Sequence, residues 1–294
     1  MMLEKAELIK KILNFADNKQ HKTMRTIYTL IAIILVAFSA CSNGVPDADY
    51  VIISTQYGDM KVLLYDDTPV HKQNFLKLAY EGKYDSLLFH RVIRDFMIQG
   101  GDPNSRHAGK DVDLGDGEIG TAIDAEIVYP KHFHKRGALA AARKGDNVNP
   151  EKKSSGSQFY IVQGQRFTPD MLDQMEAKHN TRIKNEIFYK IQPFYQDSLK
   201  YYQDNGMSEE LMELQLRIMA KVTEMAEDKG LFTIPEDIRE VYMTEGGTPH
   251  LDGDYTVFGE VVEGLDVIDS IAQVMTDMRD RPTKDVRMAI RIED

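Results

Sequence analysis

The chain has 294 residues, of which 42% are hydrophobic and 28% are charged, and its formal net charge is −11. This composition excludes an intrinsically disordered chain and is sufficient for one or two folded domains. The acidic balance argues against a nucleic-acid partner, because binding phosphates requires a basic surface. It leaves polypeptide partners open and, as a solubility argument, favours a monomer. The single cysteine, Cys41, excludes an intramolecular disulfide.

The N-terminus contains one apolar run, residues 27–40 (IYTLIAIILVAFSA). It is shorter than the roughly 20 residues that span a bilayer and is typical of the apolar region of a signal peptide. We therefore predict that residues 1–40 are a signal peptide. Residues 1–23 are an upstream start artefact if translation begins at Met24.

The residues Phe38-Ser39-Ala40-Cys41 resemble a bacterial lipobox, in which small residues precede a lipidated cysteine. This predicts lipidation of Cys41, a polar tether at 41–49 and attachment of the protein to a membrane. The expected location is the bacterial cell envelope, facing the periplasm from the outer or the inner membrane. Ordinary cleavage and an uncleaved anchor are the alternatives.

The first predicted elements are strands at 49–56 and 59–65, joined by a turn at Tyr57-Gly58. Thr68-Pro69 predicts the N-cap and first turn of a helix that ends near Gly82. Further strands are expected at 87–92, 96–99, 138–142, 158–162, 256–262 and 286–292, and a second helix at 265–273. This order predicts a mainly β fold, a closed eight-stranded antiparallel barrel capped by two helices.

Residues 164–245 have a helical rather than a strand pattern, with apolar residues at three- and four-residue steps. Pro193 is expected to divide the first helix, and Gly206 followed by Ser208 predicts a turn and a new helix start. We predict a helical hairpin inserted into a β domain that spans 50–163 and 246–294. Its many methionines either pack the hairpin or form an adaptable surface for unfolded polypeptides.

Two motifs that could indicate other chemistry lack the context they need. Residues 115–120 match the GxGxxG string of dinucleotide-binding folds, but no buried strand precedes them and no helix follows, so they are interpreted as a glycine-rich loop. His132 and His134 could form a metal pair, but no third ligand is evident, so they are interpreted as a surface strand entry. We expect neither a metal nor a cofactor.

Residues 89–102 (FHRVIRDFMIQGGD) place polar side chains in a strand-like apolar pattern. In strand geometry Phe89, Arg91 and Ile93 share one face, and after a break at 94–95 Met97 and Gln99 form the next row. A buried guanidinium without a partner is costly. Arg91 therefore has an internal carboxylate partner or meets a ligand.

This segment, followed by 156–161 (GSQFYI) and 248–259 (TPHLDGDYTVFG), resembles the signature of the cyclophilins, a family of peptidyl-prolyl cis-trans isomerases. The resemblance implies isomerisation of X-Pro bonds in proline-containing polypeptides, here unfolded or folding envelope proteins. It implies catalytic roles for Arg91 and Gln99. It assigns substrate binding to Phe96, Met97, Ala142, Gln158, Tyr160, Leu251 and Tyr255. The alternative is a catalytically weak chaperone or scaffold that uses the helical insertion.

Two further expectations concern the neighbourhood of the implied pocket. Phe159 should belong to the core, because it points away from Tyr160 in a strand. The hydroxyl of Tyr160 must find a partner or water. Under the resemblance, Arg91 donates a hydrogen bond to the prolyl nitrogen as amide resonance is lost.

Overall fold

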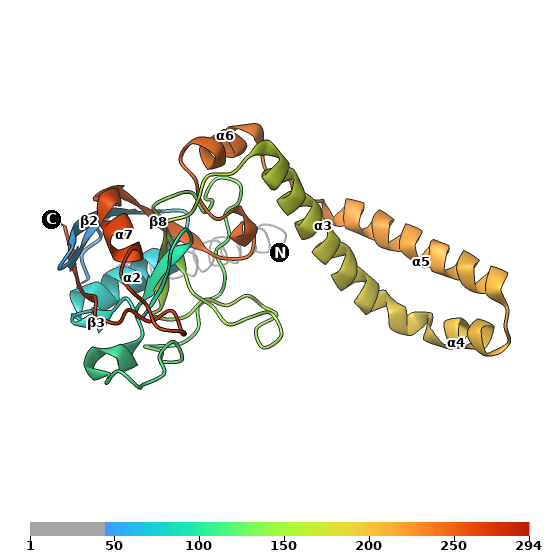
Figure 1. Cartoon of the computed structure of the whole chain (residues 1–294), viewed down its shortest axis with the longest axis horizontal. Helices are drawn as coiled ribbons and strands as arrows, with labels where there is room; N and C mark the ends of the chain where they lie inside the picture. Colours follow the sequence, from blue (N-terminus) through green and yellow to red (C-terminus); the bar gives the residue numbers. More distant parts are fainter. Residues whose placement is uncertain (1–44, 294) are drawn as a thin grey trace, which may run out of the picture. The chain divides into compact units, whose positions relative to one another are not determined.

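The computed structural model describes residues 45–293 (Figure 1). The predicted signal peptide and its lipidation site Cys41 lie outside these residues. Across residues 45–293, none of the helices combines the length and the apolar character that crossing a membrane requires.

The described residues contain nine strands, which form one antiparallel sheet in the order β3-β9-β1-β2-β8-β6-β7-β5-β4. The strands are β1 (Tyr50–Thr55), β2 (Gly58–Leu64), β3 (Leu87–Leu88), β4 (Arg91–Ile93), β5 (Met97–Gly100), β6 (Ala138–Ala141), β7 (Phe159–Val162), β8 (Val257–Glu263) and β9 (Arg287–Ile292). The predicted first hairpin is confirmed, since Thr55 pairs with Gly58 across the turn.

The predicted strand at 87–92 is wrong, because it divides into β3 and β4 at Phe89-His90. These two strands are the opposite edges of the sheet: Leu87 pairs with Met288 of β9, whereas Val92 pairs with Ile98 of β5. A flat sheet of this size would separate its edges by about 38 Å at about 4.8 Å per strand. The link from β3 to β4 spans at most about 11 Å, so the sheet has to curl.

The sheet is curled into a half-barrel and is not the closed eight-stranded barrel that the sequence predicted. Among the described strands no hydrogen-bonded ladder joins β3 to β4. The physical reason is the turn at Phe89-His90, where the chain leaves β9: the Phe89 N–H still donates to the Val286 carbonyl at 2.9 Å, in register with the β3–β9 pairs, whereas the Val92 N–H donates to the Asp280 carbonyl at 2.8 Å.

The curled sheet carries apolar clusters on both faces because β7 alternates between them. The ring of Phe159 lies 5.3 Å from that of Phe75, in helix α2 (Pro69–Tyr80), and 5.6 Å from that of Tyr84. Tyr160 points to the other face, into a cluster with Met97. The predicted core position of Phe159 is confirmed, and the opposite face is left for the pocket described below. Helix α7 (Leu265–Ala272) follows β8.

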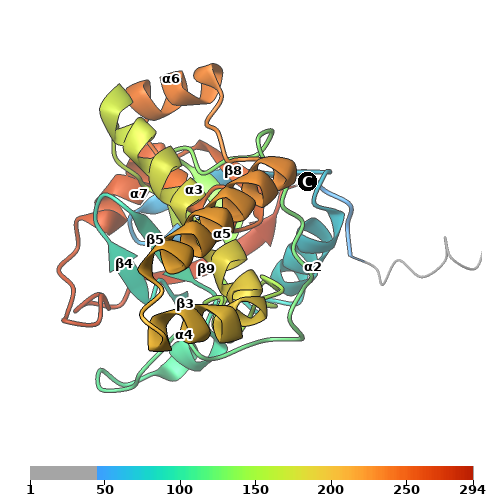
Figure 2. The same ribbon diagram turned by 90° about the vertical axis from the view of Figure 1, so that its right-hand side faces the viewer.

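Four α-helices lie between residues 164 and 245 of the described chain: α3 (Pro169–Ile191), α4 (Gln196–Asp204), α5 (Ser208–Lys229) and α6 (Glu236–Thr244). The predicted break at Pro193 is present as a short 3-10 helix, η2 (Gln192–Phe194). Helices α3 and α5 lie side by side (Figure 2). We call residues 169–229 the helical arm, which extends away from the strands (Figure 1).

The helical arm has its own apolar core between α3 and α5. Its buried members are Ile183, Ile187, Leu214, Ile218, Val222 and Ala226. Full burial of an aliphatic side chain contributes about 1.5–3 kcal/mol. These buried residues join the two long helices of the hairpin that the helical periodicity of the sequence predicted.

Candidate active site

Three neighbouring strands bring Arg91, Gln99 and Tyr160 into one row. Arg91 pairs with Gln99 between β4 and β5, and Gln99 pairs with Tyr160 between β5 and β7. Residues that pair directly across adjacent strands present their side chains on the same face. The same ladder places Ile93 beside Met97, so an apolar row lies next to the polar one.

Arg91 is partly exposed, with 41% of its side-chain surface accessible. Its Nη1 donates a hydrogen bond to Oε1 of Gln99 at 3.3 Å, and its Nε lies 3.6 Å from Oδ2 of Asp280. The carboxylate of Asp280 is itself 44% exposed, so this ion pair is a weak surface interaction. Arg91 therefore has a carboxylate partner within the same chain, and its guanidinium still presents N–H donors to solvent.

A chain of amides fixes Gln99 from behind. Gln99 Nε2 donates to Oε1 of Gln158 at 3.1 Å. Gln158 Nε2 in turn donates to the carbonyl oxygens of Gly115 and Gly117, both at 2.8 Å. The glycine-rich loop thus holds Gln158, which is buried, and through it Gln99 and Arg91.

A small pocket of about 100 Å³ lies in front of this row. Its lining residues are Arg91, Phe96, Met97, Gln99, Ala142, Arg143, Tyr160, Leu251 and Tyr255. The structure thus brings together every residue proposed from the resemblance except Gln158, which lies behind Gln99. We call this hollow the proline pocket, after the ring that the resemblance assigns to it. An apolar socket of this size beside exposed guanidinium donors suits a small ring attached to a polar amide.

The hydroxyl of Tyr160 finds its partner in His134. Tyr160 Oη lies 2.9 Å from His134 Nε2, and His134 Nδ1 lies 2.8 Å from Oδ1 of Asp252. Tyr242 of α6 donates to the other oxygen of Asp252 at 2.6 Å. Burial raises the pKa of Tyr160, so its hydroxyl stays protonated and can donate to the imidazole. The network rigidly orients the ring of Tyr160 in the proline pocket.

His134 therefore corrects the interpretation of His132 and His134 as a surface strand entry. Its side chain is only 1% exposed, and both ring nitrogens are occupied by Asp252 and Tyr160. His132 instead stacks on Tyr65, with ring centroids 3.9 Å apart. The sequence could not distinguish the roles of His132 and His134, because the residues that contact them are distant in the sequence.

Arg143 also lines the pocket, although the resemblance assigned it no role. Its guanidinium lies over the ring of Tyr255, 4.4 Å from the centroid, and its Nε donates to the Asp254 carbonyl at 2.8 Å. The Arg143 side chain is only 4% exposed, and cation–π contacts stabilise by about 2 kcal/mol when they are desolvated. Arg143 thus fixes the Tyr255 side of the pocket next to Ala142.

The Asp254 carboxylate joins the pocket wall to the helical arm. Lys152 and Arg182 of α3 both pair with it. Burial tends to raise the pKa of Asp254, but the hydrogen bonds from Lys152 and Arg182 outweigh burial and hold that pKa below its ordinary value. The carboxylate therefore stays ionised near neutral pH and holds α3 against the loop that follows Leu251.

Comparisons with known proteins agree with this geometry. The family model described as cyclophilin type peptidyl-prolyl cis-trans isomerase matches residues 50–195 and 236–291. The chain is 31% identical over 237 residues to a Staphylococcus epidermidis protein named as a peptidyl-prolyl cis-trans isomerase, and the match covers 80% of this chain and 87% of that protein. The chain therefore belongs to the cyclophilin-type peptidyl-prolyl cis-trans isomerase family, and it is an isomerase.

Two further similarities are more limited in what they show. A Streptococcus pyogenes protein named as a bifunctional phosphatase/peptidyl-prolyl cis-trans isomerase is 33% identical over 239 residues, which are 80% of this chain and 37% of that protein. A crystal structure of a cyclophilin type isomerase from Cryptosporidium parvum is 22% identical, with a TM-score of 0.48, over 84% of this chain and 98% of that chain. The family model does not match residues 196–235, which include all of α4 and α5.

Proposed function

We propose that Arg91 lowers the barrier to X-Pro rotation by donating a hydrogen bond to the prolyl nitrogen. The barrier to amide rotation is about 18–20 kcal/mol, because resonance gives the C–N bond partial double-bond character. The prolyl nitrogen becomes basic only when this resonance is lost. A donor directed at it therefore stabilises the twisted transition state more than either planar state.

The observation that carries this proposal is the position of Arg91 at the rim of the proline pocket, held by Gln99 and still partly exposed. Phe96, Met97 and Tyr160 form an apolar socket for the proline ring, and Gln99 is free to contact the substrate backbone through its remaining capacity. A rate gain of about 10⁵ requires about 7 kcal/mol. The charge-assisted hydrogen bond to the prolyl nitrogen, made only in the twisted state, supplies part of that amount, whereas burial of the ring, which is equal in all states, contributes to binding.

The test is isomerisation of an Ala-Pro peptide, followed by NMR exchange spectroscopy, with the full-length chain. Arg91→Ala should lower kcat/KM about 100-fold, in the range of a lost transition-state donor. Arg94→Ala is the matched control, because Arg94 is an exposed arginine three residues away that does not line the pocket. Unchanged activity in Arg91→Ala would refute the Arg91 mechanism.

We further propose that the substrates are folding envelope proteins, because a lipid on Cys41 would hold the enzyme at a membrane. The support is the apolar run at 27–40 followed by Phe38-Ser39-Ala40-Cys41 in the sequence. Metabolic labelling with a radioactive fatty acid should label the protein, and Cys41→Ser should abolish both the label and sedimentation with membranes. A soluble, unlabelled wild-type protein would contradict this location.

A second candidate function, holding of non-native polypeptides, is favoured by the exposed apolar side chains of the helical arm. Phe194 is 85% exposed, and Met212, Leu216 and Met219 lie along one side of α5 at 59%, 65% and 52% exposure. If this surface holds clients, replacing Phe194 and Leu216 by serine should weaken suppression of client aggregation, whereas Arg91→Ala should leave the suppression intact. Equal suppression by the wild type, by Arg91→Ala and by the variant with serine at both 194 and 216 would exclude this function of the arm.

A further inference from the structure

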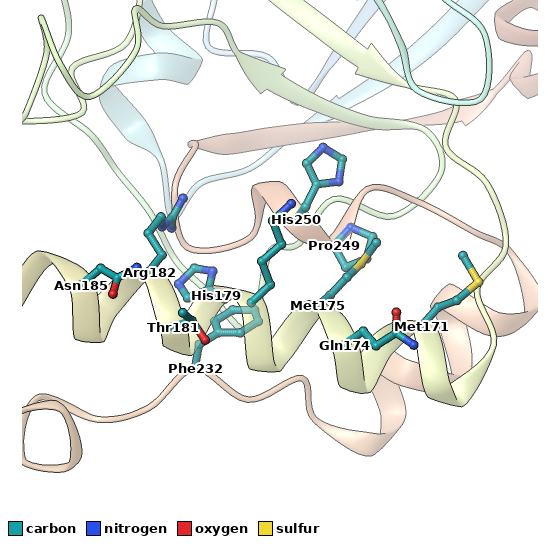
Figure 3. A pocket seen from close by; sticks show the side chains of 11 residues that line it. Met171, Gln174, Met175, His179, Thr181, Arg182, Asn185, Phe232, Pro249 and His250 are labelled. Atoms are coloured by element: carbon teal, nitrogen blue, oxygen red, sulfur yellow. The ribbon is translucent and has the colours of Figure 1, made fainter. Parts of the chain in front are cut away.

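A second and larger hollow lies beside the proline pocket, between α3 and the 3-10 helix η3 (Pro249–Leu251). Its volume is about 800 Å³, compared with about 100 Å³ for the proline pocket. Apolar lining comes from Met171, Met175, Phe232 and Pro249, and polar lining includes Lys178 and His250. We call this hollow the arm groove, and Figure 3 shows the side chains of α3 along it. Its size is that of a site for an extended ligand rather than for one small ring.

The floor of the arm groove is fixed before any ligand binds. Asn180 forms two hydrogen bonds with the backbone of Phe232: its Oδ1 accepts from the N–H at 2.8 Å, and its Nδ2 donates to the carbonyl at 2.9 Å. The ring of Phe232 stacks on His179 at 4.2 Å and on Tyr129 at 5.2 Å. A preformed apolar floor of this kind reduces the entropy that binding costs.

The arm groove and the proline pocket share one wall, which is η3. Leu251 lines the proline pocket, whereas Pro249 lines the arm groove. His250 lines the groove, and its ring lies 5.4 Å from the ring of Phe96, a residue of the proline pocket. An extended polypeptide advances about 3.3 Å per residue, so a few residues beyond the proline are enough to cross this wall.

The arm groove also contains a cation that the rest of the structure leaves available. Lys178 is exposed at the groove, and within residues 45–293 no carboxylate forms an ion pair with it. The neighbouring cation, Arg182, is neutralised by Asp254. In a chain of net charge −11, this local positive charge favours an acidic side chain in whatever occupies the groove.

We propose that the arm groove is a second substrate subsite, which binds an apolar and acidic stretch of the same polypeptide whose proline occupies the proline pocket. This inference rests on the proposed function, because it assumes that the pocket receives the proline. It gives α3 a role in the reaction: α3 extends the enzyme's recognition from one X-Pro bond to the residues around it. The occupant is a stretch of the client, so short proline peptides do not reach the groove.

The test compares two substrates with the full-length chain. One is a blocked Ala-Pro tetrapeptide, and the other is an unstructured peptide of about 15 residues, long enough to cross η3, with one central proline flanked by leucine and glutamate. Lys178→Glu and Met171→Glu should each reduce the ratio of kcat/KM on the long peptide to that on the short one about tenfold, mainly through KM. Lys190→Glu and Tyr201→Glu are the controls, since both residues are exposed on the helical arm outside the groove.

Each outcome decides the proposal. An unchanged ratio in the groove variants overturns it, whether or not the absolute activities fall, and so does an equal fall in the control variants. Wild-type protein inactive on both peptides would instead count against the proposed function. In that case fluorescence anisotropy of the labelled long peptide tests the groove alone: Lys178→Glu should weaken binding about tenfold and Lys190→Glu should not.

Discussion

Gln158 accepts a hydrogen bond from Gln99 at 3.1 Å and thereby orients the amide that faces Arg91. The two donors of Gln158 are both used on the carbonyls of Gly115 and Gly117, so its amide cannot turn over without losing all three interactions. The direction of the Arg91 guanidinium is therefore set by a loop that never contacts the pocket. We therefore propose that Gln158 positions Arg91, in place of the substrate-binding role that the resemblance implied.

Replacing Gln158 by leucine tests this chain of amides. Gln158→Leu should lower kcat about tenfold with a smaller change in KM, because the socket stays intact while Arg91 loses its fixed direction. It should also cost about 1–3 kcal/mol of unfolding free energy, since two carbonyls lose their donor. Steady-state isomerase kinetics and urea denaturation measure the two effects.

Gln163→Leu is the control for the stability effect alone. Gln163 is also a buried glutamine near β7, where it accepts from the Asp95 N–H at 2.7 Å and donates to Asp269 at 3.0 Å. Its loss should destabilise to a similar degree without lowering kcat. A similar fall in kcat for both variants would mean that Gln158 has only a structural role.

The hydroxyl of Tyr160 should stabilise the fold through His134. Tyr160→Phe keeps the ring in the proline pocket but leaves the buried Nε2 of His134 without its partner, which should cost about 1–2 kcal/mol. Urea denaturation gives the change in unfolding free energy. Tyr255→Phe should cost less, because the contact of Tyr255 with Arg143 is made by its ring. Equal losses would show that the His134 contact is not what the hydroxyl of Tyr160 contributes.

Strand periodicity predicted only the shared faces of the segment 89–99, whereas the other residues of the pocket were assigned from the resemblance. The alternation that places Arg91 beside Ile93 and Met97 beside Gln99 is local, and the ladder between β4 and β5 only aligns the two pairs. The break at Phe89-His90 was not predictable, because the backbone partners on its two sides, Val286 and Asp280, are both far away in the sequence. The prediction of a closed sheet is therefore wrong, whereas the structure does bring the residues assigned to the pocket together, and their roles stay a prediction.

At the N-terminus of α2, too, the hydrogen-bond partner could not be predicted from the local sequence. Thr68 was predicted to cap the helix, but its hydroxyl donates to the Tyr65 carbonyl at 3.2 Å and makes no cap contact. The carboxylate of Glu126 accepts from the N–H groups of Val70 and His71 instead, at 3.1 and 2.9 Å. Sequence reasoning located the helix start correctly from Thr68-Pro69 but could not identify a partner from a distant loop.

Glu126 should therefore stabilise α2 as a cap does. Glu126→Ala removes the acceptor for two orphan N–H groups and a negative charge near the positive end of the helix dipole, which together should cost about 1–2 kcal/mol. Thermal and urea denaturation measure the loss, and Glu126→Gln, which keeps one acceptor oxygen, should recover part of it. Glu81→Ala at the other end of α2 is the control and should have little effect. Equal stability of Glu126→Ala and wild type would contradict the capping role.

His90 should make the unfolding free energy depend on pH. Burial lowers the pKa of His90 to about 4, with the charge of Asp102 acting in the opposite direction and those of Arg91 and Arg281 adding to the burial effect. In the unfolded chain the pKa of a histidine is about 6.5, so the unfolded state binds more protons between these values. The stability contributed by neutral His90 is thus present above about pH 6.5 and is lost as the pH falls toward about 4.

The expected loss from this one group between pH 7 and pH 5 is about 2 kcal/mol. His90→Gln cannot titrate, so its unfolding free energy should fall by about 2 kcal/mol less than that of wild type over this range, while groups common to both proteins cancel. Urea denaturation at several pH values measures the slope. His107→Gln, at an exposed histidine, is the control for the removal of an imidazole. An unchanged slope in His90→Gln would show that His90 does not titrate on unfolding in this range.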